Sequence, residues 1–203
     1  PADGVTPAQL RALRAEFDDW WEESRNHDKN YGEMIDGRPR FDLQIPGHSR
    51  MAPLLRRVNS PTEISGTYLD AVTSSRIPDM VADLIGPNVK FHHSKINAKL
   101  PGANTEVKWH QDFPFTPHSN DDLVTALLAL DDVDETNGPL IAALGSHKDG
   151  LAGLWHNGTF TGVAGERESQ AWAKEAKTFT MRAGSVCLMH TRAGHSSGPN
   201  LGT

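Results

Sequence analysis

The spacing of the apolar residues changes at Val89, and this change constrains the fold more than any other feature of the sequence. Before Val89, apolar residues recur three or four positions apart, as on a helix with one buried face. After it, short apolar or alternating runs are separated by turn signals such as Pro101-Gly102 and Ala183-Gly184. Runs of this kind are typical of antiparallel sheets. We therefore expect a mainly β fold with N-terminal helices.

The first 88 residues are predicted to be mainly helical. Thr6 can cap a helix that has Pro7 in its first position and continues to about Ser24. Helical periodicity returns farther along the chain, where Pro78 interrupts it. A polar, glycine-rich stretch after the first helix predicts a long loop. This loop covers 25–50, and the later helical segments cover 51–58 and 62–85.

The remaining residues are predicted to form the β core. A polar insertion over 151–176 interrupts the core and ends in a short helix over 168–176. This insertion and the long front loop are the predicted walls or lids of a site. We expect one domain over 1–203, with the helical front half over 1–88 and the core over 89–203. The predicted strands cover 89–99, 107–112, 123–130, 140–143, 178–181 and 185–190.

Charge and composition exclude several classes of partner. The chain has 20 Lys and Arg against 26 Asp and Glu, so there is no basic excess to bind nucleic acid. No apolar stretch approaches the roughly 20 residues that a membrane helix needs. The lone cysteine, Cys187, cannot form an internal disulfide, which favours a reducing, cytoplasmic location. The expected partner is a small-molecule substrate, and the sequence does not indicate an oligomeric state.

The segment Lys108–Pro114 carries the most informative residues. On a strand, His110 and Asp112 would share one face and Gln111 would point to the other. An imidazole, a carboxylate and a second imidazole form the facial set that suits non-haem iron(II) and leaves coordination positions open. His-x-Asp alone is a short pattern that also fits a hydrogen-bonded surface pair, so a third ligand is needed to support the metal.

Two histidines near the end of the chain are candidates for this third ligand. His190 shares strand parity with Val186 and Leu188, whereas His195 follows the Ala193-Gly194 bend, which can redirect the backbone. Spacing alone does not choose between them.

Four motifs in order resemble the phytanoyl-CoA dioxygenase family, over about residues 86–203. The resemblance implies a double-stranded β-helix (jelly-roll, cupin-like) core that uses iron(II), 2-oxoglutarate and O2, with succinate and carbon dioxide as coproducts. It also implies that His110, Asp112 and His195 are the catalytic metal ligands. The motifs are Trp109–Asp112, Asn137–Leu140, Gly145–Lys148 and Gly184–Asn200.

The resemblance further implies how 2-oxoglutarate is held. Its keto-acid end would chelate the iron, and an arginine about ten residues past the distal histidine would anchor its far carboxylate. Only eight residues follow His195, and none is arginine, so we expect the chain to stop short of that residue. Ser197 matches a family position that bonds the same carboxylate, and Lys95 could supply a second charge. Ser197, Lys95 and Gln111 are the candidate cofactor-binding residues.

Two other functions fit parts of the sequence. The same ligands could hold zinc or manganese in a hydrolase, which would not depend on 2-oxoglutarate. A non-catalytic β-sandwich that binds a ligand would not bind stoichiometric iron. The substrate is not indicated, because it depends on the loops around the site. Candidate contacts for an anionic substrate are Arg38, Arg40, Arg167 and Arg192.

Overall fold

A computed structural model describes residues 3–202 of the chain. Helix α1 (Pro7–Glu23) starts as predicted, with Pro7 in its first turn. The Thr6 side chain accepts a hydrogen bond from the Gln9 backbone N–H, and the Gln9 side chain accepts one from the Thr6 backbone N–H. This capping box satisfies two backbone donors that a helix leaves free at its start. The helix ends one residue before the predicted Ser24.

A four-stranded sheet occupies the region where the front loop and the helix over 51–58 were expected, so both predictions are wrong. Its antiparallel strands follow chain order, and the last one belongs to the second half of the chain. The apolar runs here are too short for periodicity to separate a strand from a helix. The Asp36-Gly37 hairpin turn, with positive φ at both residues, was the missed signal. The strands are β1 (Tyr31–Ile35), β2 (Arg38–Leu43), β3 (Leu55–Asn59) and β4 (Lys95–Asn97).

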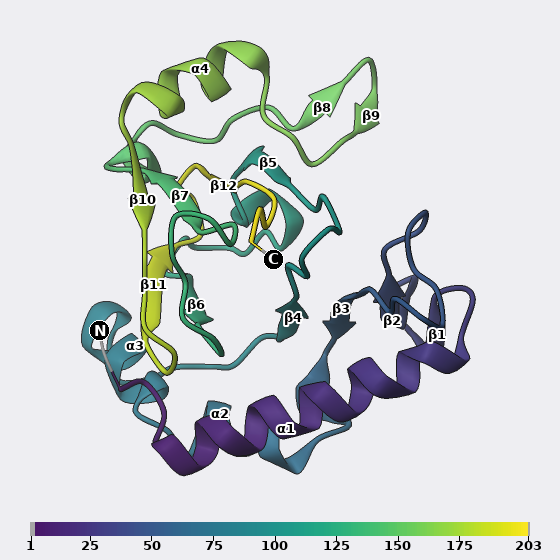
Figure 1. Ribbon diagram of the computed structural model, residues 1–203. Coiled ribbons are helices and arrows are strands. Elements are labelled where there is room, and N and C mark those ends of the chain that lie inside the picture. The colour runs from purple at the N-terminus through teal and green to yellow at the C-terminus, as the bar shows by residue number, and fades with distance from the viewer. Residues whose placement is uncertain (1–2, 203) are drawn as a thin grey trace.

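One face of this sheet packs against α1. Phe41, Leu55 and Val58 are buried there, and Phe17 and Trp20 of α1 cover them. Strands alternate their side chains between faces, so the neighbouring polar residues point away from α1. This opposite face therefore looks toward the rest of the molecule (Figure 1).

The next two helices confirm the predicted interruption at Pro78. Helix α2 (Gly66–Thr73) is capped by Ser65, and α3 (Ile77–Ile85) has Pro78 in its first turn. Proline lacks the N–H that a helix interior needs, but it is well tolerated in a first turn. Short 3-10 helices occur at η1 (Ser24–Asn26), η2 (Pro61–Glu63), η3 (Phe113–Phe115) and η4 (Ser146–Lys148).

The second half of the chain is built from short antiparallel strands. A four-stranded sheet has the order β10-β7-β12-β5, and β11 pairs with β6. Each predicted strand region overlaps a strand, although the one over 89–99 shrinks to β4, the strand predicted over 178–181 begins two residues earlier as β10, and β12 was not predicted. The strands are β5 (Val107–His110), β6 (Val124–Leu128), β7 (Leu140–Ala143), β10 (Ala176–Phe179), β11 (Val186–His190) and β12 (His195–Ser197).

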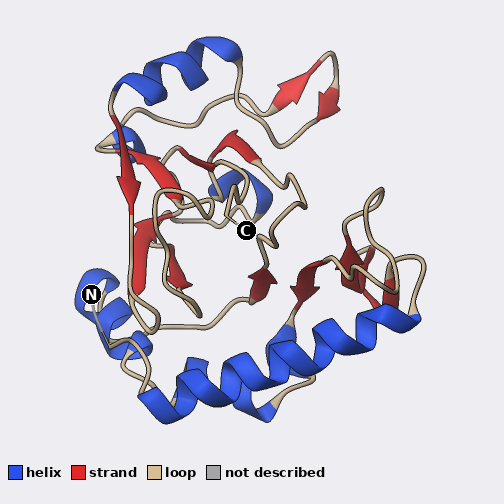
Figure 2. Ribbon diagram, viewed as in Figure 1, coloured by secondary structure: helices blue, strands red, loops and turns tan. Residues whose placement is uncertain are grey.

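The insertion between β7 and β10 forms a separate arm. It contains the hairpin of β8 (Trp155–His156) and β9 (Thr159–Phe160), followed by α4 (Glu166–Lys174) (Figures 1 and 2). Trp172 of α4 is buried against Ala143 and Leu154, which holds this helix to the core. Among the helices described over residues 3–202, none combines the length and the apolar character of a membrane span.

Candidate metal centre

Three side chains from distant parts of the chain converge at the edge shared by β5 and β12. His195 lies opposite His110 in the strand register, and their ring centroids are 4.1 Å apart. Oδ1 of Asp112 is 3.6 Å from Nε2 of His110 and 3.7 Å from Nε2 of His195. One candidate ligand atom from each residue lies within 4.8 Å of the other two. The structure thus brings together the three predicted ligands.

Asp112 reaches this site from outside the strand. Strand β5 ends at His110, and the backbone at Asp112 is right-handed helical, with φ −73° and ψ −33°. The expected strand alternation therefore does not place this carboxylate. The turn into η3 directs it instead, and the Phe113 N–H fixes that turn by donating to the Thr191 carbonyl at 2.9 Å.

Hydrogen bonds orient all three donor groups. Nδ1 of His110 lies 2.8 Å from the Lys108 carbonyl oxygen, and Nδ1 of His195 lies 2.9 Å from that of Ala193. A carbonyl can only accept, so each Nδ1 carries the proton and each Nε2 has a free lone pair. Thr125 Oγ1 donates to Oδ2 of Asp112 at 2.8 Å, which leaves Oδ1 toward the histidines.

The donor set fits a first-row divalent ion. Nitrogen and carboxylate ligands lie about 2.1 Å from zinc, for example, so two ligands of one ion are at most about 4.2 Å apart. The two Nε2-to-Oδ1 distances, 3.6 and 3.7 Å, fall within that limit. His110 and His195 are also nearly buried, at 8% and 7% exposure. A buried carboxylate between two imidazoles needs a neutralising partner, and a divalent cation supplies one.

The electrostatics of the site favour the metal-binding protonation states. Burial works to raise the pKa of Asp112, but the neighbouring imidazoles of His110 and His195, the charge of Lys95 and the hydrogen bond from Thr125 hold that pKa well below its usual range. Burial, followed by repulsion from His110, lowers the pKa of His195 to about 4. An anionic carboxylate and a neutral imidazole are the forms that bind a dication.

His190 lies apart from this group. It is on β11, which pairs with β6 in the other sheet, and its ring stacks on that of His147 with centroids 5.3 Å apart. Its Nδ1 accepts a hydrogen bond from the Arg192 backbone N–H at 3.1 Å. The spacing did not decide between His190 and His195 as the third ligand. In the structure only His195 lies beside His110 and Asp112.

Gln111 holds loops together. Its amide nitrogen donates to the carbonyls of Gly150 and Arg192, and its amide oxygen accepts from the Ala152 N–H. The side chain is fully buried, and both amide hydrogens are used. These bonds give Gln111 a role in holding the loops together, and its contact with a cofactor stays a prediction.

The other two candidate cofactor residues border the site. Ser197 is half-buried on β12, two positions beyond His195 and so on the same strand face. Lys95 is exposed on β4, and its charge lowers the pKa of Asp112 and of His195. Both residues remain predicted contacts of the cosubstrate.

The four arginines proposed for an anionic substrate do not form one group. Arg40 is buried and paired with Glu33 and Glu63, which gives it a structural role. Arg192 pairs with Asp121. Arg38 is exposed on β2, and Arg167 is exposed on α4.

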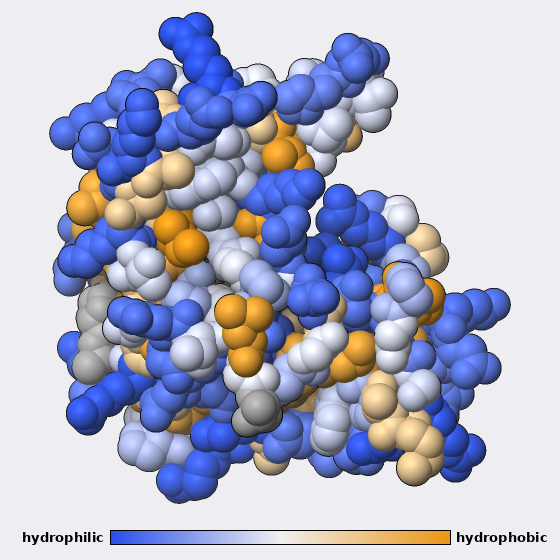
Figure 3. Space-filling model, turned by 45° about the horizontal axis from the view of Figure 1, so that its top comes forward, coloured by the Kyte–Doolittle hydropathy of each residue, from blue (hydrophilic) through white to orange (hydrophobic). Residues whose placement is uncertain are grey.

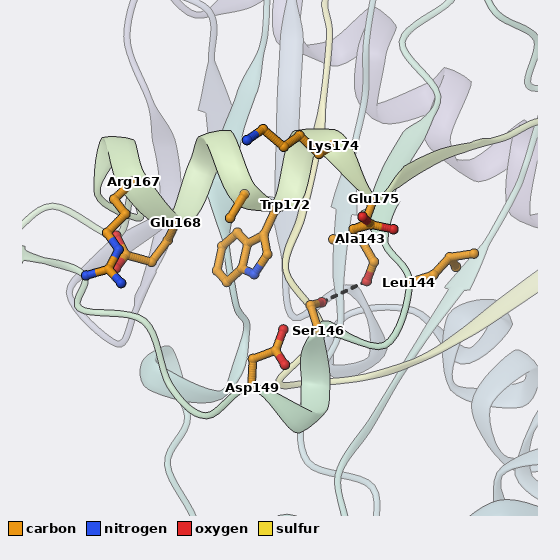
Figure 4. Close-up of a pocket in the computed structure, with 10 residues that line it drawn as sticks. Ala143, Leu144, Ser146, Asp149, Arg167, Glu168, Trp172, Lys174 and Glu175 are labelled. Atoms are coloured by element: carbon orange, nitrogen blue, oxygen red, sulfur yellow. Dashed lines mark hydrogen bonds between the residues drawn. The ribbon is translucent and has the colours of Figure 1, made fainter.

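A polar groove of about 590 Å³ lies between α4 and η4 (Figure 4). Arg167, Glu168 and Trp172 line it, whereas none of the three candidate ligands does. Its floor supports the metal centre indirectly, because Ser146 Oγ donates to the Ala143 carbonyl and accepts from the Gly194 N–H, next to His195. We therefore assign Ser146 and the other residues that line this groove a structural role, because they hold the turn before His195 in place.

The fold and the donor set define a class: a mainly β protein with a site of two histidines and one carboxylate. The model of the family described as Phytanoyl-CoA dioxygenase (PhyH) matches residues 2–203. The chain belongs to the phytanoyl-CoA dioxygenase family.

Curated relatives extend beyond the chain. It is 37% identical over 156 residues to a "Probable alpha-ketoglutarate-dependent hypophosphite dioxygenase" of Stutzerimonas stutzeri, covering 74% of this chain and 54% of the relative. It is 31% identical over 174 residues to an ectoine dioxygenase of Streptomyces anulatus, covering 72% and 55%. The chain thus spans about half the length of these relatives.

Solved structures share the fold. The non-heme alpha ketoglutarate dependent carbocyclase SnoK matches with a TM-score of 0.72 at 18% identity, covering 98% of this chain and 72% of that one. EctD from S. alaskensis with 2-oxoglutarate and 5-hydroxyectoine matches with a TM-score of 0.72 at 22% identity, covering 98% and 65%. The predicted double-stranded β-helix core with N-terminal helices is confirmed.

Proposed function

We propose that the chain is the catalytic part of an iron(II)- and 2-oxoglutarate-dependent dioxygenase that oxidises a small molecule. The convergence of two Nε2 atoms and one carboxylate oxygen carries this proposal. The names of the relatives support it, because the S. stutzeri relative is described as alpha-ketoglutarate-dependent and EctD was solved with 2-oxoglutarate.

We assign one group of residues to the metal and another to the cosubstrate. His110, Asp112 and His195 hold the iron through Nε2, Oδ1 and Nε2 on one side, which leaves coordination positions for other ligands. Iron and 2-oxoglutarate, when bound, would supply oxidative decarboxylation of 2-oxoglutarate by O2 to succinate and carbon dioxide, coupled to oxidation of the substrate by the second oxygen atom. Ser197, which matches a family position that bonds the cosubstrate's far carboxylate, and Lys95, as a second charge, are the contacts that we propose for that carboxylate.

The test is anaerobic addition of iron(II) and then 2-oxoglutarate. We expect the weak visible charge-transfer band of the iron–2-oxoglutarate chelate to appear, and oxygen then to release succinate. Asp112→Ala should give neither signal. Binding of iron without the band would contradict use of this cosubstrate, and hydrolysis that needs no 2-oxoglutarate would favour a zinc or manganese hydrolase.

The substrate class stays broad at this level. The relatives are named for hypophosphite and ectoine, which are both small molecules. We propose a small-molecule substrate and, from the single Cys187, a reducing cytoplasmic location.

A further inference from the structure

A row of exposed aromatic rings leads outward from the metal centre. The Phe115 ring meets the His110 ring edge-on, with centroids 5.9 Å apart. Phe160 meets Phe115 at 5.1 Å, and Trp155 meets Phe160 at 5.4 Å. The three rings, which we call the aromatic row, are 43%, 36% and 66% exposed in the order Phe115, Phe160, Trp155. Contiguous exposed apolar surface of this kind marks a binding site more often than isolated residues do.

The arm that carries two of these rings has a defined shape. Its hairpin turns at Asn157-Gly158, where both residues have positive φ, as a tight two-residue turn requires. The Ala164 N–H donates to the Trp109 carbonyl at 2.8 Å, which returns the arm to β5. A Cβ at Gly162 would lie 2.7 Å from the Phe115 ring, so glycine lets that ring pack against the arm.

The arm also stands clear of the rest of the molecule. In Figure 1 the β8–β9 hairpin projects from the end opposite α1, and Figure 3 shows it overhanging a notch in the surface. Among the described strands, β8 and β9 pair only with each other. All three rings of the aromatic row therefore keep exposed surface beside this hairpin.

A basic face lies on the sheet that contains β3 and β4, which Figure 1 shows on the α1 side of β5 and β12, away from the β8–β9 hairpin. Arg57 pairs with Asn97 and Asn59 pairs with Lys95 across β3 and β4, so these four residues share the face that points away from α1. Arg57 Nε donates to Asn97 Oδ1 at 3.1 Å, and its Nη atoms donate to no residue between 3 and 202. Burial, and then repulsion from Arg56, lowers the pKa of Arg57, although the charge of Asp42, its partner across β2 and β3, acts to raise it.

The two features approach each other beside the metal ligands. The Phe115 ring packs edge-on against the His110 ring, and Arg57 shares one face of β3 and β4 with Lys95. The loops that lead to them also touch, since the rings of His92 and His118 are 4.9 Å apart. A molecule at the metal centre would thus have an apolar wall on one side and a cationic wall on the other.

We propose that the substrate of this centre is a small organic acid with an apolar segment, its acid group paired with Arg57 and its apolar part packed on Phe160 and Trp155. This inference rests on the proposed function for the oxidation itself. It differs from what the name of the S. stutzeri relative would suggest, because hypophosphite has no apolar segment to use the aromatic row.

Straight-chain carboxylates from acetate to decanoate, with the matching primary amides, test the proposal. Their binding is measured by calorimetry on the anaerobic iron(II) protein saturated with 2-oxoglutarate, so that an acid occupying the cosubstrate site is competed away. We expect affinity to rise by up to about fourfold per methylene along the series. The amides should bind at least about tenfold more weakly than the acids, as for loss of a charge-assisted hydrogen bond.

Two sets of variants measure the contribution of the aromatic row and that of Arg57 independently. Phe160→Ala with Trp155→Ala should flatten the dependence on chain length and leave acetate binding unchanged. Arg57→Gln should weaken all acids alike and remove the difference between acid and amide. Leu144→Ala, at another exposed apolar residue, and Arg182→Gln, at another exposed arginine, are the controls and should change neither.

Several outcomes would overturn the proposal. These are affinities independent of chain length, amides that bind as well as acids, hypophosphite binding as tightly as octanoate, or wall variants that behave like their controls. The iron–2-oxoglutarate band is recorded on every variant and should persist. Loss of that band in the unaltered protein would refute the proposed function, whereas a normal band with no preference among the probes would refute only the substrate class.

Discussion

The carbonyl oxygens of Lys108 and Ala193 decide which nitrogen each ligand histidine presents. Each accepts a hydrogen bond from Nδ1 of the histidine two residues later, which turns Nε2 toward Asp112. The same short-range contact therefore appears at two unrelated points of the chain. It makes the orientation of the imidazoles a local property of the backbone.

Substitution of each candidate ligand should show whether His195 or His190 is the third ligand. His110→Ala, Asp112→Ala and His195→Ala should each abolish stoichiometric iron binding, because each removes one of three convergent donors. His190→Ala should retain iron, since His190 stacks on His147 instead. Iron content after anaerobic reconstitution is the measurement, with circular dichroism to check the fold. Loss of iron in His190→Ala together with its retention in His195→Ala would reverse the assignment.

Thr125 should tune the metal affinity without contacting the metal. Its hydroxyl donates to Asp112 Oδ2, and loss of such a supporting bond typically costs tenfold to a hundredfold in affinity. We expect Thr125→Val to weaken iron(II) binding within about that range, measured by competition with a chelator. Thr125→Ser keeps the hydroxyl and should bind nearly as well as the unaltered protein. Equal affinities for the Val and Ser variants would mean that the bond does not orient Asp112.

Among the elements, β12 places the distal histidine, although its residues carry no strand signal. It has only three residues and follows a glycine bend, so it is too short for alternation to be seen. It becomes a strand because β5 and β7 pair with it on both sides. By contrast, β7 has its predicted bounds, since Leu140–Ala143 is a continuous apolar run between turn signals.

The turn before β12 depends on a glycine at residue 194. A Cβ there would lie 2.4 Å from the Trp172 ring, so Gly194→Ala forces the turn or the indole to move. We expect a loss of about 1–3 kcal/mol in the free energy of unfolding, as for other overpacked sites, together with weaker iron binding. Denaturant unfolding and iron titration are the measurements. Gly153→Ala is the matched control, because a Cβ there meets nothing within 4 Å, and an equal loss in both variants would contradict this reason.

At the scale of the whole molecule, the sequence predicted the β class of the second half and missed the sheet of the first. The His-x-Asp pattern and the family resemblance predicted three residues that do converge, because metal donors belong to short motifs. Arg57 and the aromatic row were not predicted as contacts. Their placement depends on strand pairing and on the fold of the arm, which no short pattern encodes.

Stability of the metal-free protein should fall as the solution becomes acidic. The pKa of His195 drops from 6.5 to about 4 on folding, so between these values the unfolded chain binds a proton that the folded chain does not. The free energy of unfolding should therefore decrease by up to about 3 kcal/mol from pH 6.5 to pH 4. Urea unfolding across this range measures it. His195→Asn should show a shallower decrease, and equal slopes would exclude His195 as the cause.

The central position of β12 in its sheet also sets an order of events during biosynthesis. A nascent chain that has emerged only as far as β11 already contains His110 and Asp112, but it lacks the segment that inserts between β5 and β7. Such a chain offers two of the three candidate donors. The three-donor site can therefore form only after the β12 segment has been synthesised and has inserted between β5 and β7.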